Sequence, residues 1–235
     1  MNKFSRNSIF YKIYLYYNLY FRNKAYKKRA SYSQDQEDLF INNYFKNIDN
    51  GFYLDIGCYH PIKYSNTALL HNRGWQGINI DMNQTSIDLF KILRKKDKNI
   101  CAAISSSNKE VTQFIDHSYS PVNTIDKNFS QMISKRLQIK PFSERKIYTN
   151  TLNEILEKYE IQIKKIDFLN IDVEGHDYEV LKGINFLNIK PKIICIEIDN
   201  HEKNFSEESI QNYLKKFNYK IIKRIGFNGF FEKII

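Results

Sequence analysis

Glycine and proline are scarce in this chain, cysteine is scarcer still, and no long apolar run occurs. Eight Gly and four Pro in 235 residues exclude collagen-like and linker-like chains. Cys58, Cys101 and Cys195 lie far apart in apolar stretches, which predicts buried free thiols in a reducing compartment rather than a disulfide framework or a metal knuckle. No stretch reaches the roughly 18 apolar residues that a transmembrane helix needs. The remaining composition, 42% hydrophobic and 26% charged, is that of a globular chain.

Acidic residues are absent from positions 1–30, which we call the N-terminal arm. The arm carries eight of the 36 basic residues, whereas the rest of the chain has 28 basic residues against 26 acidic ones. The net charge of +10 therefore belongs largely to the arm. A nucleic-acid-binding domain would carry its cations on the folded surface, so no nucleic-acid partner is expected.

The arm is also rich in tyrosine, from Phe10 to Phe21. Twelve residues are too few to span a bilayer. Tyrosine rings suit the boundary between headgroups and acyl chains, and the flanking cations would be attracted to anionic lipid. Three alternatives stay open: peripheral contact with a membrane, a helix that packs on its own domain or on a second subunit of a homo-oligomer, and disorder.

Residues 31–235 predict a single α/β domain. Short apolar strands alternate with helical stretches, which favours a mostly parallel sheet with helices on both faces and right-handed crossovers. Residues 105–148, rich in Ser and Asn, are predicted to be irregular. Strands are expected at 52–57, 77–81, 99–104, 166–173, 192–198, 219–225 and 229–235, the last two as an antiparallel hairpin. Helices are expected at 39–45, 64–72, 85–96, 152–159, 177–187 and 207–217, with Ser-x-x-Gln and Thr-x-x-Glu capping boxes at Ser33 and Thr151.

Carboxylates stand at the carboxyl ends of four expected strands, where α/β sheets bind ligands. Asp81 follows Gly57 by 24 residues, close to the spacing of about 20 at which an acidic side chain binds ribose hydroxyls in nucleotide-binding sheets. The turn after the first strand has one glycine instead of Gly-x-Gly-x-x-Gly. This disfavours a pyrophosphate cradle and favours an adenosine ligand without phosphates. An NAD-dependent sugar oxidoreductase stays open as the alternative.

Five motifs, in order, resemble the FkbM family of S-adenosylmethionine-dependent methyltransferases. They are Ser33-Gln34-x-x-Glu37-Asp38, Gly51-Phe52-Tyr53-Leu54-Asp55-Ile56-Gly57, Pro61-x-x-x-Ser65-Asn66-Thr67, Gly74-Trp75-x-Gly77-Ile78, and Ile171-Asp172-Val173-Glu174-Gly175-His176-x-x-x-Val180-Leu181-Lys182-Gly183. The resemblance implies the class I methyltransferase fold, a Rossmann-like seven-stranded sheet whose last strand is antiparallel. It also implies O-methylation of a sugar, glycan or glycosylated metabolite, as in polysaccharide biosynthesis. The high Lys, Asn and Ile content suggests a bacterial genome.

The resemblance further implies a set of cofactor-binding residues. Asp55 and Gly57 would line the methionine portion of S-adenosylmethionine, and Asp81 would hold the ribose. Asn83 with Ala102 and Ala103 would border the adenine. Position alone suggests that Gln34 and Asn66 reach the methionine carboxylate or ammonium.

The candidate catalytic residues are His176, Asp172 and Glu174. His176 is the favoured base, because histidine titrates near neutral pH. Asp172 and Glu174, with Glu197 and Asp199, could hold Mg²⁺ through oxygen ligands. Structural roles stay open for each: Asp172 as a helix cap, Glu174 in a loop ion pair, and His176 as a residue of the first helical turn. A catalytically silent, membrane-docked binding module is the alternative from another class. A cytoplasmic location is expected, with the arm at the inner face of the membrane if it binds lipid.

Overall fold

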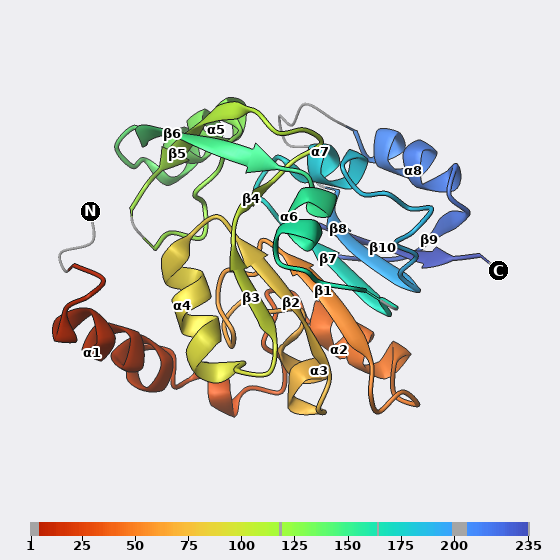
Figure 1. The fold of residues 1–235 in the computed structure, drawn as a ribbon, viewed down its shortest axis with the longest axis horizontal. Helices are drawn as coiled ribbons and strands as arrows, with labels where there is room; N and C mark the ends of the chain where they lie inside the picture. The colour runs from red at the N-terminus through yellow and green to blue at the C-terminus, as the bar shows by residue number, and fades with distance from the viewer. Residues whose placement is uncertain (1–4, 118, 164, 199–205, 235) are drawn as a thin grey trace.

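The computed structural model describes residues 5–117, 119–163, 165–198 and 206–234. Within these ranges, seven strands form one sheet in the order β3-β2-β1-β7-β8-β10-β9 (Figure 1). β10 runs antiparallel to both of its neighbours, and the pairs from β3 to β8 are parallel. The strands are β1 (Phe52–Ile56), β2 (Gln76–Asp81), β3 (Lys98–Cys101), β7 (Phe168–Ile171), β8 (Ile193–Glu197), β9 (Tyr219–Ile225) and β10 (Asn228–Lys233). This confirms the predicted mostly parallel sheet with a C-terminal antiparallel hairpin at one edge.

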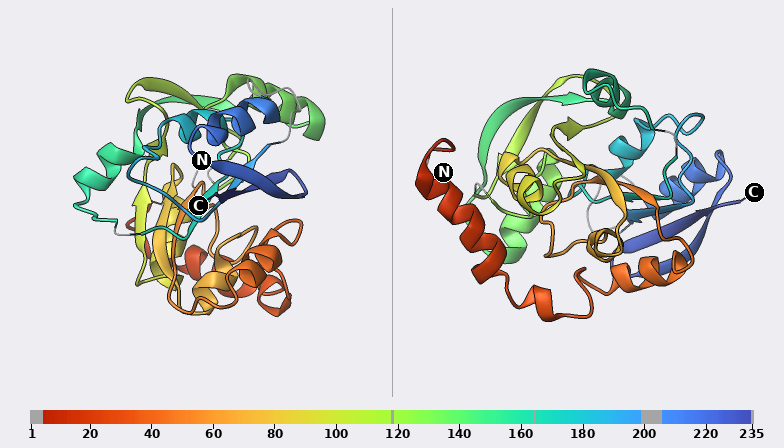
Figure 2. Two further views of the ribbon diagram at one scale, coloured as in Figure 1. Left: turned by 90° about the vertical axis from the view of Figure 1, so that its right-hand side faces the viewer. Right: turned by 60° about the horizontal axis from the view of Figure 1, so that its bottom comes forward.

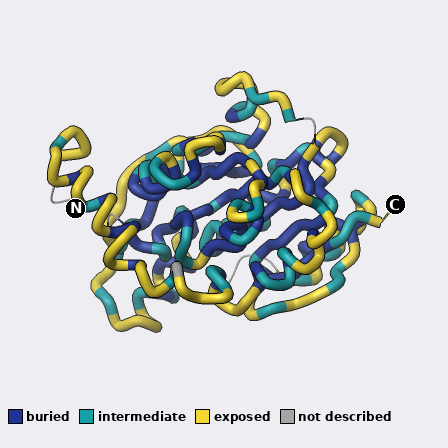
Figure 3. The backbone as a smooth tube through the Cα atoms, turned by 90° about the horizontal axis from the view of Figure 1, so that it is seen from below, coloured by how far each residue is buried: buried dark blue, intermediate teal, exposed yellow. Residues whose placement is uncertain are grey.

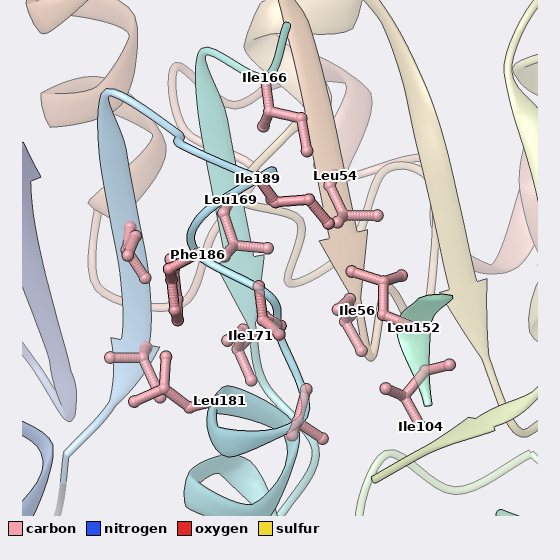
Figure 4. Close-up of a cluster of buried hydrophobic side chains, with 14 of the residues drawn as sticks. Leu54, Ile56, Ile104, Leu152, Ile166, Leu169, Ile171, Leu181, Phe186 and Ile189 are labelled. Carbon is pink, nitrogen blue, oxygen red and sulfur yellow. The ribbon is translucent and has the colours of Figure 1, made fainter. Parts of the chain in front are cut away.

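The central strands are buried on both faces, which explains their nearly continuous apolar sequences. In β1, Leu54 and Ile56 point into a large core, whereas Tyr53 points into a second core on the opposite face. Figure 4 shows the large core, in which β1 and β7 side chains meet Leu152 and Leu181 from two helices. Figure 3 shows buried central strands surrounded by exposed turns.

Helices cover both faces, as predicted. α6, α7 and α8 contribute to the large core, and α2 and α3 contribute to the opposite one. α4 joins this second face, since its Ile87 and Phe90 pack with Cys58 and Cys101. The helices are α2 (Glu37–Tyr44), α3 (Ala68–Asn72), α4 (Gln84–Leu93), α6 (Leu152–Lys158), α7 (Asp177–Lys182) and α8 (Glu207–Lys215).

The prediction that residues 105–148 are irregular is wrong. They contribute β5 (Glu110–Ile115), α5 (Lys127–Leu137) and most of β6 (Ser143–Asn150). β6 pairs with β5 and with β4 (Ala103–Ile104), so the strand expected at 99–104 is divided between two sheets. Most of β6 is exposed, and a strand that buries so little needs no apolar run. β5, α5 and β6 lie together at the top of the molecule in Figure 1.

The two predicted capping boxes have different outcomes. Thr151 and Glu154 form theirs at the start of α6. α2 instead begins after Gln36, whose backbone is left-handed and whose side chain makes no capping bond. The hydroxyl of Ser33 instead donates to the carboxylate of Asp38 at 2.8 Å. This local hydrogen bond takes the place of the expected capping box between Ser33 and Gln36.

The N-terminal arm forms α1 (Ile9–Tyr17), a π-helical turn η1 (Asn18–Arg22) and a short 3₁₀ turn η2 (Tyr26–Lys28). It runs along the outside of the domain from α4 to α2 (Figure 2). Its buried Leu15 and Leu19 pack with Leu89 of α4 and with Tyr119. Among the open alternatives for the arm, packing on its own domain is therefore observed. No helix in the described part of the chain has the length and apolarity that crossing a membrane requires.

Candidate active site

A cavity of about 320 Å³ lies at the carboxyl edge of β1, β2, β7 and β8. It is lined from the sheet, from the start of α2, from residues 120–125 and from α5. Several predicted site residues line it: Gln34, Gly57, Asn66, Asp81, Asn83, Ala102, Ala103, Asp172, Glu174, His176 and Glu197. The sequence therefore located the cavity.

Gly57, directly after β1, lies against the backbone of Asp172, directly after β7. Its φ is +85°, and a Cβ at this position would lie 1.7 Å from the carbonyl oxygen of Asp172. The backbone amide of Gly57 donates to Ile80 at 2.8 Å. A glycine is therefore required by contact with the protein's own backbone, and not only by a ligand as the sequence suggested.

Asp55 does not line the cavity, which corrects the expectation that it would. Its side chain is buried on the second face of the sheet, where it accepts hydrogen bonds from Thr67 at 2.6 Å and Asn170 at 2.9 Å. Burial raises the pKa of its carboxyl group, an effect that these bonds and the nearby Arg94 partly oppose. In a strand, side chains alternate between faces, and Asp55 stands one residue before the end of β1. Through these hydrogen bonds, Asp55 supports the cavity floor from the second face of the sheet.

Arg94 is the centre of the buried network that contains Asp55. Its guanidinium donates to Thr67 at 2.7 Å, to the Pro61 carbonyl at 2.8 Å and to Ser65 at 3.0 Å. The side chain is 1% exposed. These contacts tie the segment after β1 to the end of α4, and so fix the loop that leads to Asn66 on the cavity wall.

Asp81, at the end of β2, faces the cavity with a carboxylate that backbone amides hold in place. One oxygen accepts from Asn83 at 2.6 Å and the other from Tyr59 at 2.9 Å. Burial raises the pKa of Asp81 to about 6 despite these bonds. The group is therefore mainly ionised at neutral pH and retains lone pairs for two hydroxyl donors. Asn83 caps α4 by accepting from Thr85 at 2.9 Å.

Glu37, at the start of α2, and Asn228, at the start of β10, also line the cavity, and the sequence did not predict either as a site residue. The Asn228 amide donates to Glu37 at 3.0 Å, and the other Glu37 oxygen accepts from the Asp35 backbone at 2.7 Å. The buried side-chain oxygen of Asn228 has no hydrogen-bond partner among the described residues. The pair thus offers a negative, acceptor-rich corner. Glu37 belongs to the motif Ser33-Gln34-x-x-Glu37-Asp38, and this motif is the only sequence feature that points to it as a site residue.

Asn66 and Gln34 both line the cavity, as their predicted contact with a ligand requires. Asn66 donates to the side-chain oxygen of Asn170 at 3.0 Å, and Asn170 donates in turn to Asp55. These two successive hydrogen bonds hold the Asn66 amide in its orientation. Gln34 is exposed and stands near the left-handed turn at Gln36.

The turn after β7 brings Asp172, Glu174 and His176 to the cavity. Asp177 holds this turn, since its carboxylate accepts from the Val173 amide at 2.9 Å and the Gly175 amide at 3.1 Å. Glu174 and Gly175 both have positive φ. For Glu174, which is not a glycine, this conformation is costly and persists where the surroundings enforce it, often at functional sites.

His176 is the N-terminal cap residue of α7, without a side-chain capping bond. Its Nε2 lies 2.9 Å from the hydroxyl of Ser105. Burial lowers the pKa of His176, although Asp177 and Glu179 oppose the shift. The lowered pKa favours the uncharged form of the imidazole, which has a nitrogen able to accept a proton.

Three carboxylates near the ends of β7 and β8 approach one another: oxygens of Asp172, Asp177 and Glu197 lie within 4.8 Å. Such oxygens suit a hard divalent cation. However, Asp177 already accepts two backbone hydrogen bonds, and the fourth predicted ligand, Asp199, lies outside the described residues. Asp177 was not among the predicted ligands, so the cluster differs from the predicted metal site.

Taken together, this strand order and a carboxyl-edge cavity with Asp81 at the end of β2 define a class I methyltransferase fold. Residues 55–221 match the profile of the Methyltransferase FkbM domain. The chain belongs to the FkbM methyltransferase family.

A solved structure described as methyltransferase FkbM from Methylobacillus flagellatus is similar to this chain at 12% identity and a TM-score of 0.47. The match covers 92% of the present chain and 60% of that protein, so the chain spans well under two thirds of its length. No curated protein matches the sequence.

Proposed function

We propose that this protein transfers a methyl group from S-adenosylmethionine to a hydroxyl group of a sugar, in a glycan or a glycosylated metabolite. Membership of a methyltransferase family favours this cofactor over NAD. The observation that carries the proposal is the backbone-anchored Asp81 carboxylate, which faces the cavity at the end of β2.

The cavity wall offers complementary groups for each part of the cofactor. Asp81 can accept both ribose hydroxyls, and Asn83, Ala102 and Ala103 border the space beside it for an adenine ring. The Glu37–Asn228 corner can accept hydrogen bonds from the methionine ammonium. Gln34 and Asn66, which are expected to reach the methionine carboxylate or ammonium, line the same cavity. We call the wall formed by Gly57, Asp81, Asn83, Ala102 and Ala103 the cofactor half. When bound there, S-adenosylmethionine supplies an electrophilic methyl group.

We call the part of the wall formed by Asp172, Glu174, His176 and Glu197 the acceptor half. A sugar hydroxyl is a poor nucleophile at neutral pH, so a nearby base assists its attack. The imidazole of His176 would take the hydroxyl proton while the hydroxyl oxygen gains the methyl group, the methyl–sulfur bond breaks and S-adenosylhomocysteine leaves. Ser105, at 2.9 Å, orients the ring. Positioning of the acceptor in line with the methyl group supplies much of the remaining rate.

Aromatic side chains of Tyr59, Tyr64 and Phe129 also line the cavity. Tyr59 and Tyr64 have their rings stacked at 6.4 Å, and both have positive φ. Their apolar rings with polar tips suit the mixed surface of a sugar ring. This aromatic wall favours a sugar acceptor over a small charged metabolite.

Calorimetric titration of the full chain with S-adenosylhomocysteine and with NAD tests the cofactor. Binding of the first without the second is expected; the reverse would support the sugar oxidoreductase. Mass spectrometry of surface glycans from cells with and without the gene tests the acceptor, with a loss of 14 mass units, one CH₂, as the expected change. Cofactor binding without any such loss would support a silent binding module.

Two finer expectations remain proposals. A Mg²⁺ ion held by Asp172 and Glu197 predicts that a chelator abolishes turnover and that added Mg²⁺ restores it.

A cytoplasmic location is supported by the free state of all three cysteines. Labelling of the denatured protein with a thiol reagent straight after cell lysis should modify all three.

A further inference from the structure

The outer face of the N-terminal arm exposes large apolar side chains. α1 and η1 bury Tyr11, Leu15 and Leu19 against the domain. Their opposite face exposes Ile9 (63%), Phe10 (60%), Ile13 (56%), Tyr16 (53%), Tyr17 (54%), Tyr20 (40%) and Phe21 (65%). We call these seven side chains the outer aromatic face. Contiguous exposed apolar surface of this kind marks an interaction site.

The outer aromatic face is ordered in advance of any contact. Tyr16 stacks on Tyr20 with centroids 6.0 Å apart, and Tyr17 stacks on Phe21 at 6.2 Å. The π-helical turn continues α1 directly, so both pairs stand on one uninterrupted helical segment. Little side-chain entropy is then lost when the face is covered.

The arm is also fixed to the domain by polar contacts. The Tyr11 hydroxyl donates to Asp88 at 2.9 Å, and Arg6 pairs with the same carboxylate at 3.1 Å. The Asn18 side-chain oxygen lies 3.0 Å from Nε2 of His60. Burial lowers the pKa of His60 to about 3, so its ring stays neutral in this junction. The arm therefore presents its outer face as a fixed surface rather than as a loose tail.

Cations flank the outer aromatic face. Lys12, Arg22, Lys24 and Lys28 are all exposed, and the arm contains no acidic residue. A two-fold contact between copies would bring each set of cations against the same set on the partner, which is unfavourable. An anionic surface complements both the charge and the aromatic rings.

We propose that the outer aromatic face docks on a membrane surface that contains anionic lipid. The rings would lie at the level of the headgroups and the cations would meet lipid phosphates, as in interfacial helices. This places the enzyme at the membrane, whatever its methyl acceptor, so its test is independent of the proposed reaction. The membrane contact adds to the packing of the arm on its own domain, because the two involve opposite faces of the arm.

Sedimentation of the full chain with vesicles tests the proposal. Strong binding is expected to phosphatidylcholine vesicles that contain phosphatidylglycerol, and weak binding to phosphatidylcholine alone. Equal binding to both kinds of vesicle, or none to either, would overturn the proposal.

Paired variants separate the contribution of the aromatic rings to vesicle binding from that of the cations. Phe10→Ser with Phe21→Ser should weaken vesicle binding about tenfold or more, whereas Tyr148→Ser with Tyr159→Ser, exposed elsewhere, should not. Lys12→Gln with Lys24→Gln should weaken it about fivefold per cation, whereas Lys215→Gln with Lys216→Gln on α8 should leave it unchanged.

Circular dichroism of each variant checks that the fold is kept. Unchanged binding in the arm variants would contradict the proposal. So would sedimentation velocity that shows a dimer dissociated by the Phe10 and Phe21 changes, because a second copy would then be the occupant.

Discussion

The two halves of the cavity are held in place by different means. The cofactor half stands on a buried network in which Arg94, Thr67 and Asp55 connect β1 to the end of α4. The acceptor half depends on a short turn held by the Asp177 carboxylate, with Glu174 and Gly175 in left-handed conformations. The comparison teaches that the proposed cofactor half is supported by buried side chains that connect the sheet to α4, whereas the proposed acceptor half is supported by the hydrogen bonds of one short turn.

The strongest test of this contrast is Arg94→Met. It leaves the buried Pro61 carbonyl without its donor and removes the positive charge near the buried Asp55 carboxylate, so a loss of about 3–5 kcal/mol in unfolding free energy is expected. Urea unfolding followed by circular dichroism measures it. Lys91→Met, exposed on the same helix, is the control and should change stability by less than about 0.5 kcal/mol. Similar losses in both variants would show that the network is not a support.

His176→Gln should affect chemistry rather than the scaffold. Loss of the base should lower turnover by about a hundredfold or more, with affinity for S-adenosylhomocysteine and the unfolding midpoint unchanged. Turnover is measured once an acceptor is identified, and affinity by calorimetry. A variant that keeps full turnover would remove His176 from the mechanism, and one that loses cofactor affinity would assign it to the cofactor half.

Gly57→Ala and Gly74→Ala sharpen the comparison between the cavity floor and an ordinary turn. Both glycines have positive φ, but the added Cβ would clash with the Asp172 backbone only at position 57, while position 74 has open space. Gly74→Ala should cost about 1 kcal/mol, and Gly57→Ala about 1–3 kcal/mol more. Unfolding midpoints in urea measure the difference. Equal losses of unfolding free energy in the two variants would show that the Asp172 backbone leaves room for a side chain at position 57.

The pH dependence of cofactor affinity should show the smallest effect. Because the pKa of Asp81 is raised to about 6, the carboxylate gains a proton as the pH falls through that value and loses acceptor strength. Affinity for S-adenosylhomocysteine should therefore fall several-fold between about pH 7.5 and pH 5. Asp81→Asn, which is neutral throughout, should bind weakly and without this slope. A slope that persists in the Asn variant would assign the titration to another group.

The sequence predicted the alternation of strands and helices because the parallel strands are buried on both faces and read as apolar runs. It missed β5 and β6, because strands with exposed faces carry polar sequences such as Ser143–Asn150. Spacing pointed to Asp81 as a ligand-binding residue, and Asp81 lines the cavity; its contact with a ribose stays a prediction.

Other site features depend on more than spacing. Asp55 does not line the cavity because its side chain points to the second face of β1. A shift of one residue along the strand would put it on the other face. The Glu37–Asn228 contact joins residues 191 positions apart, and no local pattern reports such a pairing.

The most direct test of the account is the affinity of Asp81→Ala for S-adenosylhomocysteine, compared with that of Asp88→Ala on the neighbouring helix. Loss of charge-assisted hydrogen bonds to the ribose should weaken binding about tenfold to a hundredfold in the first variant, and leave it unchanged in the second. Equal affinity in both variants and the unmodified protein would contradict the claim that the end of β2 holds the cofactor.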